Sequence, residues 1–193
     1  MNNTLIIAIS GASGAGKTTI VKRLATHFNT SYVCFDDFIE ADTYPTDMKE
    51  WLVQGADLSL VQSPGFTQRL AQLKLNSSNR FIFIEEPFGR VRNSMSHLID
   101  YVILLDLPME LCLARIIQRH VHRTKSDEVN SLLSYLVKYE DHLRDVYISA
   151  VNQARQSADL TINEVLPVEA TTQLIKTWLA TKTDQAVCAE PVV

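Results

Sequence analysis

The length and composition of the chain, 193 residues of which 46% are hydrophobic, suit one compact α/β domain and are short for two. A net charge of −4, with Lys and Arg spread along the chain, argues against a nucleic-acid-binding or membrane-binding surface. Three cysteines without metal-ligand spacing, and no apolar run near the ~18 residues of a membrane span, favour a protein of the reducing cytoplasm.

The first patterned stretch is 5–19, LIIAISGASGAGKTT, where a short apolar run breaks into glycine. The apolar run predicts a strand buried on both faces, and the 3.6-residue period that follows predicts a helix beginning at about Lys17. Gly11, Gly16, Lys17 and Thr18 fit the motif Gly-x-x-x-x-Gly-Lys-[Ser/Thr] in that structural context. The predicted nucleotide-binding residues are Gly11, Ala12, Ser13, Gly14, Ala15, Gly16, Lys17, Thr18 and Thr19.

Each residue type in this loop has its own chemical reason. Glycine lets the backbone turn until successive N–H groups face a phosphate, and the helix N-terminus adds partial positive charge. Lys17 supplies a cation for the β- and γ-phosphates, and the Thr18 hydroxyl can ligate the Mg²⁺ that bridges them. We therefore expect ATP and Mg²⁺ as cofactors, the alternative being a glycine-rich turn that binds nothing.

A second short strand, predicted over 32–35, runs directly into Asp36 and Asp37. The carboxyl ends of parallel strands share the edge that carries the phosphate loop, so Asp36 should lie near the transferred phosphate. There it could accept a proton from a substrate hydroxyl, position that hydroxyl, or hold Mg²⁺ through water. We predict Asp36 as the catalytic carboxylate and Asp37 as a substrate contact; a capping or turn role is the alternative.

Residues 39–66 are the least regular part of the chain, with short helical possibilities only around 48–53. Such a segment beside the phosphate edge is where an acceptor site would be built. We predict an acceptor-site insert here, with Trp51 and Asp57 as substrate contacts, although Trp51 fits a packing anchor equally well. A helix is predicted to follow over 67–75.

The third predicted strand, 81–84, ends in two acids, Glu85 and Glu86. An acid after four bulky apolar residues is expected of the strand that carries the second Mg²⁺ carboxylate of such a site. Glu85 is the better placed of the two, and a surface acidic pair is the alternative. Further along the same edge, Arg90 or Arg92 could contact an anionic or polar acceptor, with a solvated loop as the competing and favoured interpretation.

The helix after the fourth predicted strand, 101–105, carries Arg115, Arg119 and Arg123 at four-residue intervals, so their side chains share one face. Arg can reach developing charge on a phosphoryl group in a fixed geometry. The basic stripe therefore predicts a lid at about 115–127, with Arg119 and Arg123 as catalytic arginines. A solvated helix face is the competing interpretation.

The last part of the chain predicts one long amphipathic helix over 128–154, with a break possible near Asp141. A fifth strand at 160–162 and a helix over 168–181 follow. The loop 163–167 then lies where an adenine base could rest.

With these motifs placed, the chain resembles the uridine kinase family and its neighbours, the nicotinamide riboside kinases and phosphoribulokinase. The likeness is best over 7–38, fair over 105–162 and poor over 39–66. It implies a three-layer P-loop NTPase fold with a five-stranded parallel sheet and helices on both faces. The single kinase-like domain would span 1–181, and 182–193 would be a disordered tail.

The resemblance also implies that Asp36 is the catalytic carboxylate, that Lys17 and Thr18 contact the phosphates and Mg²⁺, and that Glu85 is the acid of the third strand. By the same resemblance, Arg119 or Arg123 would be lid arginines, and Asp57 would be the acid that binds ribose hydroxyls. Two departures from the family pattern concern the acceptor. The family usually has glycine after its third-strand acid, where this chain has Glu86-Pro87. The tyrosine- and histidine-bearing acceptor motifs of uridine kinases are not evident in 39–66.

The predicted function is ATP-dependent transfer of the γ-phosphoryl group to a hydroxyl of a nucleoside or other ribose-bearing metabolite. A nucleoside monophosphate, dephospho-coenzyme A or sugar kinase is the alternative within the same class. A nucleotide-binding regulator with slow hydrolysis is the alternative of another class. We expect a small-molecule acceptor as partner, no nucleic acid or membrane, and a monomer or homodimer.

Overall fold

The structure, a computed structural model, describes residues 4–122 and 127–188. Its centre is a sheet of five parallel strands in the order β2-β3-β1-β4-β5. The strands are β1 (Leu5–Gly11), β2 (Tyr32–Cys34), β3 (Phe81–Glu85), β4 (Tyr101–Leu105) and β5 (Leu160–Ile162). The predicted five-stranded parallel sheet is confirmed.

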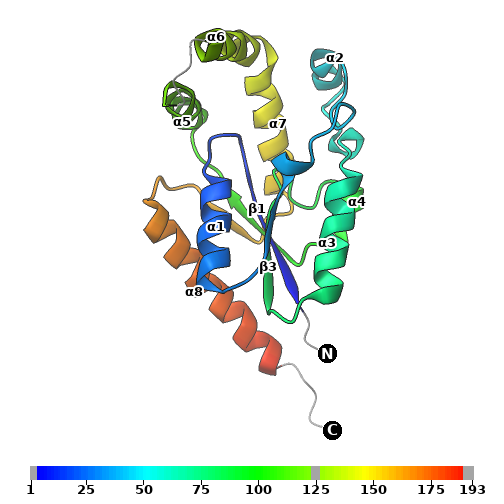
Figure 1. The fold of residues 1–193 in the computed structure, drawn as a ribbon, viewed down its shortest axis with the longest axis vertical. Helices are drawn as coiled ribbons and strands as arrows, with labels where there is room; N and C mark the ends of the chain where they lie inside the picture. The colour runs from blue at the N-terminus through cyan, green and yellow to red at the C-terminus, as the bar shows by residue number, and fades with distance from the viewer. Residues whose placement is uncertain (1–3, 123–126, 189–193) are drawn as a thin grey trace.

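Helices cover both faces of this sheet, which gives three layers (Figure 1). The helices are α1 (Lys17–His27), α2 (Met48–Val53), α3 (Pro64–Asn76), α4 (Asn93–Ser96), α5 (Met109–Val121), α6 (Asp127–Lys138), α7 (Arg144–Arg155) and α8 (Val168–Cys188). The first core packs α1 and α8 against the sheet, and the second packs α3 and α4 against its other face. Helix α7 contributes buried side chains to both cores. None of the helices in the described ranges is long and apolar enough to cross a lipid bilayer.

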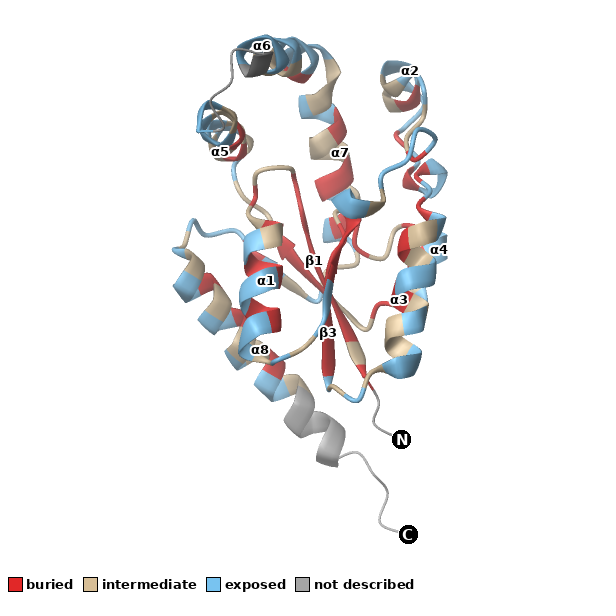
Figure 2. Cartoon of the chain, in the orientation of Figure 1, coloured by how far each residue is buried: buried red, intermediate tan, exposed pale blue. Residues whose placement is uncertain are grey.

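The burial of the central strand β1 explains why the strand sequences are unbroken runs of apolar residues. Ile7 and Ile9 belong to the first core, while Ile6 and Ala8 belong to the second. All four side chains are fully buried, since alternate residues of a strand point to opposite faces and helices cover both (Figure 2). The carboxyl ends of β1, β2 and β3 therefore meet at one edge, below α5, α6 and α7.

The predicted boundaries need correction at three places. Helix α3 begins at Pro64, three residues before the predicted start, because proline suits the first turn of a helix. Residues 35–38 form a short 3₁₀ helix, so β2 ends at Cys34. Helix α8 continues to Cys188, so the tail predicted from 182 does not begin there; residues 189–193 lie outside the described residues.

The predicted long helix over 128–154 is divided where a break was expected. A five-residue π-helix, Tyr139–Leu143, separates α6 from α7, and the chain changes direction there (Figure 1). Helix α7 consequently descends towards the sheet while α6 stays above it. This bend brings one side of α7 to the edge where β1 and β3 end.

A buried ion pair ties the segment after β3 to the start of α3. Arg92 is 1% exposed and hydrogen-bonds both carboxylate oxygens of Glu86, which is itself fully buried. Its Nη1 also donates to Ser63 Oγ at 2.7 Å, and its guanidinium lies 5.0 Å from the ring centre of Phe35. Glu86, which the sequence offered as the alternative to Glu85 for binding a metal ion, is thus bound by Arg92 in the second core.

Replacing Arg92 by Met should lower the free energy of unfolding by about 3 to 5 kcal/mol, because Glu86 would stay buried without its partner. Urea unfolding followed by circular dichroism measures the change. Arg23→Met is the matched control, since the Arg23–Glu169 pair is solvent-exposed and its loss should shift the midpoint little. Equal losses in the two variants would contradict this role for the buried pair.

Candidate active site

The loop between β1 and α1 has a backbone that only glycine accommodates at critical points. Gly14 and Gly16 have φ angles of 84° and 99°, in the left-handed region. A Cβ atom on Gly14 would lie 2.2 Å from the carbonyl oxygen of Cys112 in α5. The loop therefore packs closely against α5. It leads directly into the N-terminus of α1, whose free N–H groups are of the kind that binds anions.

Lys17, Thr18 and Glu85 form one cluster at the junction of β1, α1 and β3. The Thr18 hydroxyl donates to Glu85 Oε2 at 2.6 Å, and Lys17 Nζ lies 3.5 Å from Glu85 Oε1. Lys17 Nζ also donates to the carbonyl oxygen of Ala12 at 3.0 Å. Glu85 reaches this position because it ends β3, where it pairs with Ile9 of β1. A carboxylate and a hydroxyl side by side are oxygen donors of the kind that Mg²⁺ prefers.

Asp36 lies in the first turn of the 3₁₀ helix after β2 and lines the same cavity as this cluster. Partial burial and the neighbouring Glu85 raise the pKa of the Asp36 carboxyl, while Lys17 and Arg119 act in the opposite direction. Lys17, Glu85 and Arg119 line this cavity together with Asp36. Asp36, Lys17 and Glu85 therefore come to one cavity, as the sequence predicted, while their roles stay predictions.

The cavity that these groups share has a volume of about 750 Å³ and two chemically different ends. One end is the phosphate loop, where the lining residues are Gly11, Ala12, Ser13, Gly14, Gly16, Lys17, Thr18 and Thr19. The other end is apolar and aromatic, lined by side chains from α2, α7 and the segments around them. Such an arrangement can hold a polyphosphate beside a less polar second molecule.

A smaller cavity of about 220 Å³ lies on the other side of the loop. Ala15, the one predicted loop residue that does not line the large cavity, lines this one with Glu164 and Leu166. The last two residues belong to the loop 163–167, where an adenine base was expected. Arg115 lines both cavities and donates to the Ala15 carbonyl oxygen at 3.3 Å. A cavity therefore lies beside the glycine loop where an adenine base was expected, and base binding there stays a prediction.

The basic stripe of α5 faces the site as far as the structure describes it. Arg119 lines the large cavity, one helical turn beyond Arg115. Arg123 lies outside the described residues, as does most of the connection from α5 to α6. The lid at 115–127 and the role of Arg123 remain predictions.

The acceptor residues predicted between 39 and 66 are only partly brought to the cavity. Trp51 lines it, and at 4% exposure it is also the packing anchor considered above, with its Nε1 donating to the Asp57 carbonyl at 3.0 Å. The Asp57 carboxylate is exposed and caps a 3₁₀ turn by accepting from Ser59 N at 2.9 Å. Hydrogen bonding to the side chain and then the amide of Ser59 lowers the pKa of Asp57. Asp57 does not line the cavity, and neither does the exposed Asp37.

Arg90 does not reach the cavity, because its partners lie at the opposite edge of the sheet. It donates to the carbonyl oxygens of Ile99 at 3.1 Å and Ser157 at 2.8 Å, and to Asp159 at 2.7 Å. These residues immediately precede β4 and β5. The predicted acceptor contact is therefore corrected to a structural one, in which Arg90 ties the segment after β3 to the amino ends of two strands.

Several residues of the apolar end were not singled out from the sequence, namely Ile39, Tyr44, Met48, Phe88, Val146 and Tyr147. Tyr147 stood in the apolar stripe of the predicted long helix, which is the one signal that marked it. Which part of that stripe faces the cavity depends on the bend at Tyr139–Leu143. Periodicity alone does not contain this information.

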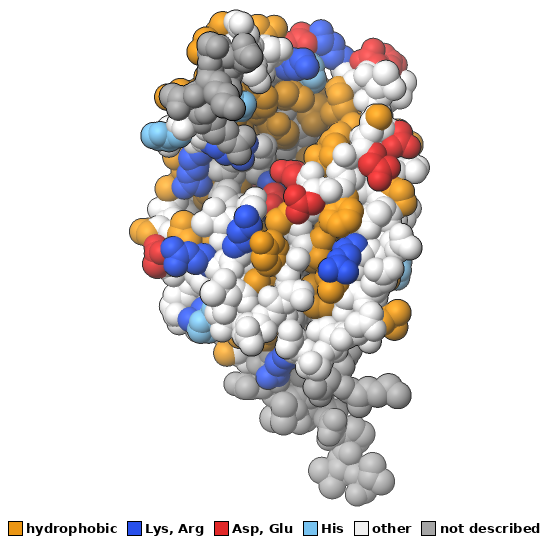
Figure 3. Space-filling view, viewed as in Figure 1, with side chains coloured by type: hydrophobic (Ala, Val, Ile, Leu, Met, Phe, Trp, Pro, Cys, Tyr) orange, Lys and Arg blue, Asp and Glu red, His pale blue; other side chains and the backbone are white. Residues whose placement is uncertain are grey.

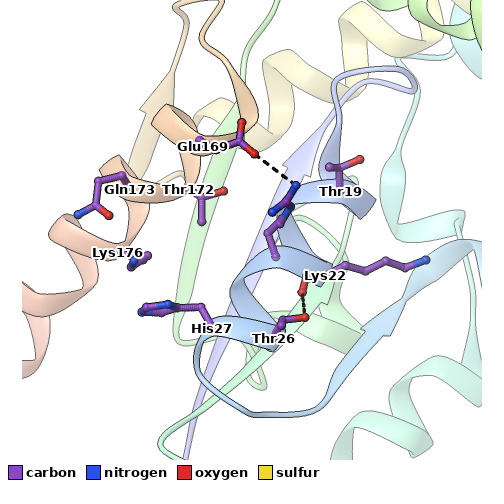
Figure 4. A pocket seen from close by; sticks show the side chains of 9 residues that line it. Thr19, Lys22, Thr26, His27, Glu169, Thr172, Gln173 and Lys176 are labelled. Atoms are coloured by element: carbon purple, nitrogen blue, oxygen red, sulfur yellow. Dashed lines mark hydrogen bonds and ion pairs between the residues drawn. The ribbon is translucent and has the colours of Figure 1, made fainter.

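A second hollow, of about 820 Å³, lies between α1 and α8 and shares only Thr19 with the site (Figure 4). It is open, and its lining includes the cationic side chains of Lys22, Arg23 and Lys176. Arg23 pairs with Glu169 at 3.2 Å, and Lys22 extends away from α8 towards the ring of Tyr32.

No family model matches this sequence, and neither does any curated protein sequence. Solved structures do match. Shikimate kinase from Acinetobacter baumannii in complex with shikimate has a TM-score of 0.55 at 20% identity, covering 94% of this chain and 96% of that one. Deoxyadenosine kinase from M. mycoides has a TM-score of 0.51 at 18% identity, covering 92% and 100%. The chain therefore shares the three-layer α/β fold of these two proteins, whereas a uridine kinase-like subtype remains a prediction.

Replacing Glu85 by Gln should remove most of the gain in ATP affinity that Mg²⁺ provides, by about ten-fold or more, because an amide is a weaker ligand than a carboxylate. Calorimetric titration of ATP with and without Mg²⁺ measures this gain. Asp37→Asn, at an exposed position outside the cavity, is the control and should keep it. An unchanged Mg²⁺ dependence in the Glu85 variant would exclude Glu85 from the metal site.

Proposed function

We propose that this protein transfers the γ-phosphoryl group of ATP to a hydroxyl of a nucleoside or another ribose-bearing metabolite. The observation that carries the proposal is the meeting of Asp36, Lys17 and the Thr18–Glu85 pair at one cavity with a phosphate-binding loop. The names of two proteins with similar folds, shikimate kinase and deoxyadenosine kinase, indicate small acceptors and support the same class of reaction.

The loop amides and Lys17 would hold the β- and γ-phosphates, and Arg115 and Arg119 would face the triphosphate from α5. Thr18 and Glu85 would hold Mg²⁺, which neutralises charge on the phosphate oxygens when bound. Within the described residues, no three His, Cys, Asp or Glu side chains form a ready-made metal cage. The remaining ligands would therefore be phosphate oxygens and water, as is usual for Mg²⁺ in such sites.

Asp36 is positioned to act on the acceptor. A hydroxyl oxygen placed between Asp36 and the γ-phosphorus forms the new P–O bond while the bond to the bridging oxygen of ADP breaks. The hydroxyl proton passes to the Asp36 carboxylate, and ADP leaves with the electron pair of the broken bond. The raised pKa of Asp36 brings its proton affinity closer to what a general base needs near neutral pH.

The segment 39–66 remains the proposed acceptor site, although its contacts differ from the predicted ones. Trp51, Tyr44 and Met48 line the same cavity as Asp36 and would contact the acceptor there. Flat aromatic side chains suit a planar ring such as a nucleobase. This supports a nucleoside over a sugar as the acceptor.

Replacing Asp36 by Asn should reduce acceptor phosphorylation by about a hundred-fold or more while leaving ATP affinity nearly unchanged. A coupled assay of ADP release over a panel of nucleosides, nucleoside monophosphates, vitamins and sugars measures the transfer. Asp37→Asn serves as the control and should remain active. A nucleotide-binding regulator would show slow hydrolysis that no acceptor accelerates and that Asp36→Asn hardly alters, and this result would refute the proposal.

The pH dependence of kcat/KM gives a separate test of Asp36. Because its pKa is raised, the carboxyl takes up a proton at a higher pH than an ordinary aspartate, and the protonated form cannot accept the hydroxyl proton. The rate should therefore fall on acidification through this raised pKa. The Asp36→Asn variant should lose that acidic limb, and a limb of unchanged position would assign it to another group.

A further inference from the structure

We infer that the hydroxyl of Tyr147 binds the terminal phosphate of ATP, and that Tyr135 of α6 holds this hydroxyl in place. The inference rests on the proposed function, because it takes ATP as the donor, and it adds a neutral phosphate-binding group to the proposed cations. It follows from the position of Tyr147 in the large cavity, from its hydrogen bonds and from the row of aromatic rings to which it belongs.

Tyr147 is a half-buried residue of α7 that lines the large cavity. The loop residues Ser13 and Lys17 line the same cavity, and so do Asp36 and Arg119. In a site of this kind the lysine contacts the β- and γ-phosphates, so the terminal phosphate would lie between Lys17 and Asp36. A phenol that shares this cavity and hydrogen-bonds the loop is therefore placed to contact that phosphate.

The hydroxyl of Tyr147 is directed to the phosphate end of the cavity. Burial raises the pKa of this phenol, while hydrogen bonds with the side chains of Tyr135 and Ser13 act in the opposite direction. Asp36 also raises this pKa, and Arg119 lowers it. Because Ser13 belongs to the loop, one of the two hydrogen bonds ties Tyr147 to the loop itself. The phenol stays protonated at neutral pH and can donate its proton to a phosphate oxygen.

Tyr135 is the partner of this hydroxyl from α6. The two phenolic oxygens lie 3.4 Å apart, and either can be the donor. When the Tyr147 hydroxyl donates to a phosphate, Tyr135 can donate to the Tyr147 oxygen, and such a chain of hydrogen bonds strengthens each of its members. Figure 3 shows hydrophobic side chains gathered in the hollow below α6, and apolar surroundings strengthen a hydrogen bond further. Tyr135 itself does not line the cavity, so it acts on a ligand only through Tyr147.

A row of aromatic rings fixes the position of both tyrosines. The Tyr135 ring stacks on His120 of α5, with centroids 6.2 Å apart, and lies 6.1 Å from the ring of Tyr139. Tyr139 is buried in the π-helix, and its ring lies 6.3 Å from that of Tyr147. The Tyr139 hydroxyl donates to the Met109 carbonyl of α5 at 3.5 Å. The row thus joins α5, α6 and α7, which keeps the Tyr147 hydroxyl at one place in the cavity.

Replacing Tyr147 by Phe keeps the ring and removes the hydroxyl. The affinity for ATP should fall by about ten-fold, because a hydrogen bond to a charged phosphate is lost, while the affinity for ADP should hardly change. Calorimetric titration with ADP, and with the ATP analogue that has a methylene group between the β- and γ-phosphates, measures both affinities in the presence of Mg²⁺ and without turnover. Equal losses for the two nucleotides, or no loss for either, would overturn the inference.

Tyr139→Phe is the matched control, because it removes a hydroxyl from the same row of rings at a residue that does not line the cavity. This variant should keep the ratio of the two affinities. A ratio that falls as far as in Tyr147→Phe would assign the effect to the packing of the rings and would overturn the inference.

Tyr135→Phe tests the positioning role. It should lower the affinity for the analogue by about three-fold, because the Tyr147 hydroxyl loses one of its partners. Tyr135→Phe combined with Tyr147→Phe should bind the analogue as Tyr147→Phe alone does, since Tyr135 acts only through that hydroxyl. Additive losses would overturn the role of Tyr135. If the preference for the analogue over ADP depends on Tyr147 but no acceptor stimulates ADP release, the proposed function fails and this inference stands.

Discussion

The structure of the site depends on the contact between Glu85 at the end of β3 and the Lys17–Thr18 pair at the start of α1. β1 and β3 are neighbours in a parallel sheet, so their carboxyl ends are held at a fixed spacing. An acid that follows one strand must then lie beside the loop that follows the other. The residues proposed to bind phosphate are thereby brought together by the backbone pairing of two strands.

The two ends of the cavity are built in different ways, and this difference explains their chemistry. The phosphate end is formed by consecutive residues of one loop, closed by a single carboxylate. The acceptor end is assembled from α2, α7 and the segments near them, whose positions depend on the bend at Tyr139–Leu143. The first is a local property of the chain, and the second is a property of its tertiary packing.

The same distinction decides what could be predicted from the sequence. The fold class could be predicted from the apolar runs. The placement of Asp36 and Glu85 at the same cavity as the glycine loop could be predicted because strand ends in a parallel sheet share an edge, whereas the roles of these residues stay predictions. Asp57 and Arg90 were misassigned because a loop side chain points to its nearest partners, here the Ser59 amide and Asp159. Tyr147 was overlooked because periodicity identifies an apolar stripe without telling what the stripe faces.

The hydrogen bond from Lys17 to the Ala12 carbonyl has a consequence for nucleotide recognition. The ammonium group links the end of the loop to its beginning and so limits the conformations that the loop can adopt. A triphosphate of the proposed kind would then cost little conformational entropy on binding, because the loop is preorganised. Its phosphate oxygen would replace the Ala12 carbonyl oxygen as a hydrogen-bond acceptor for the same nitrogen.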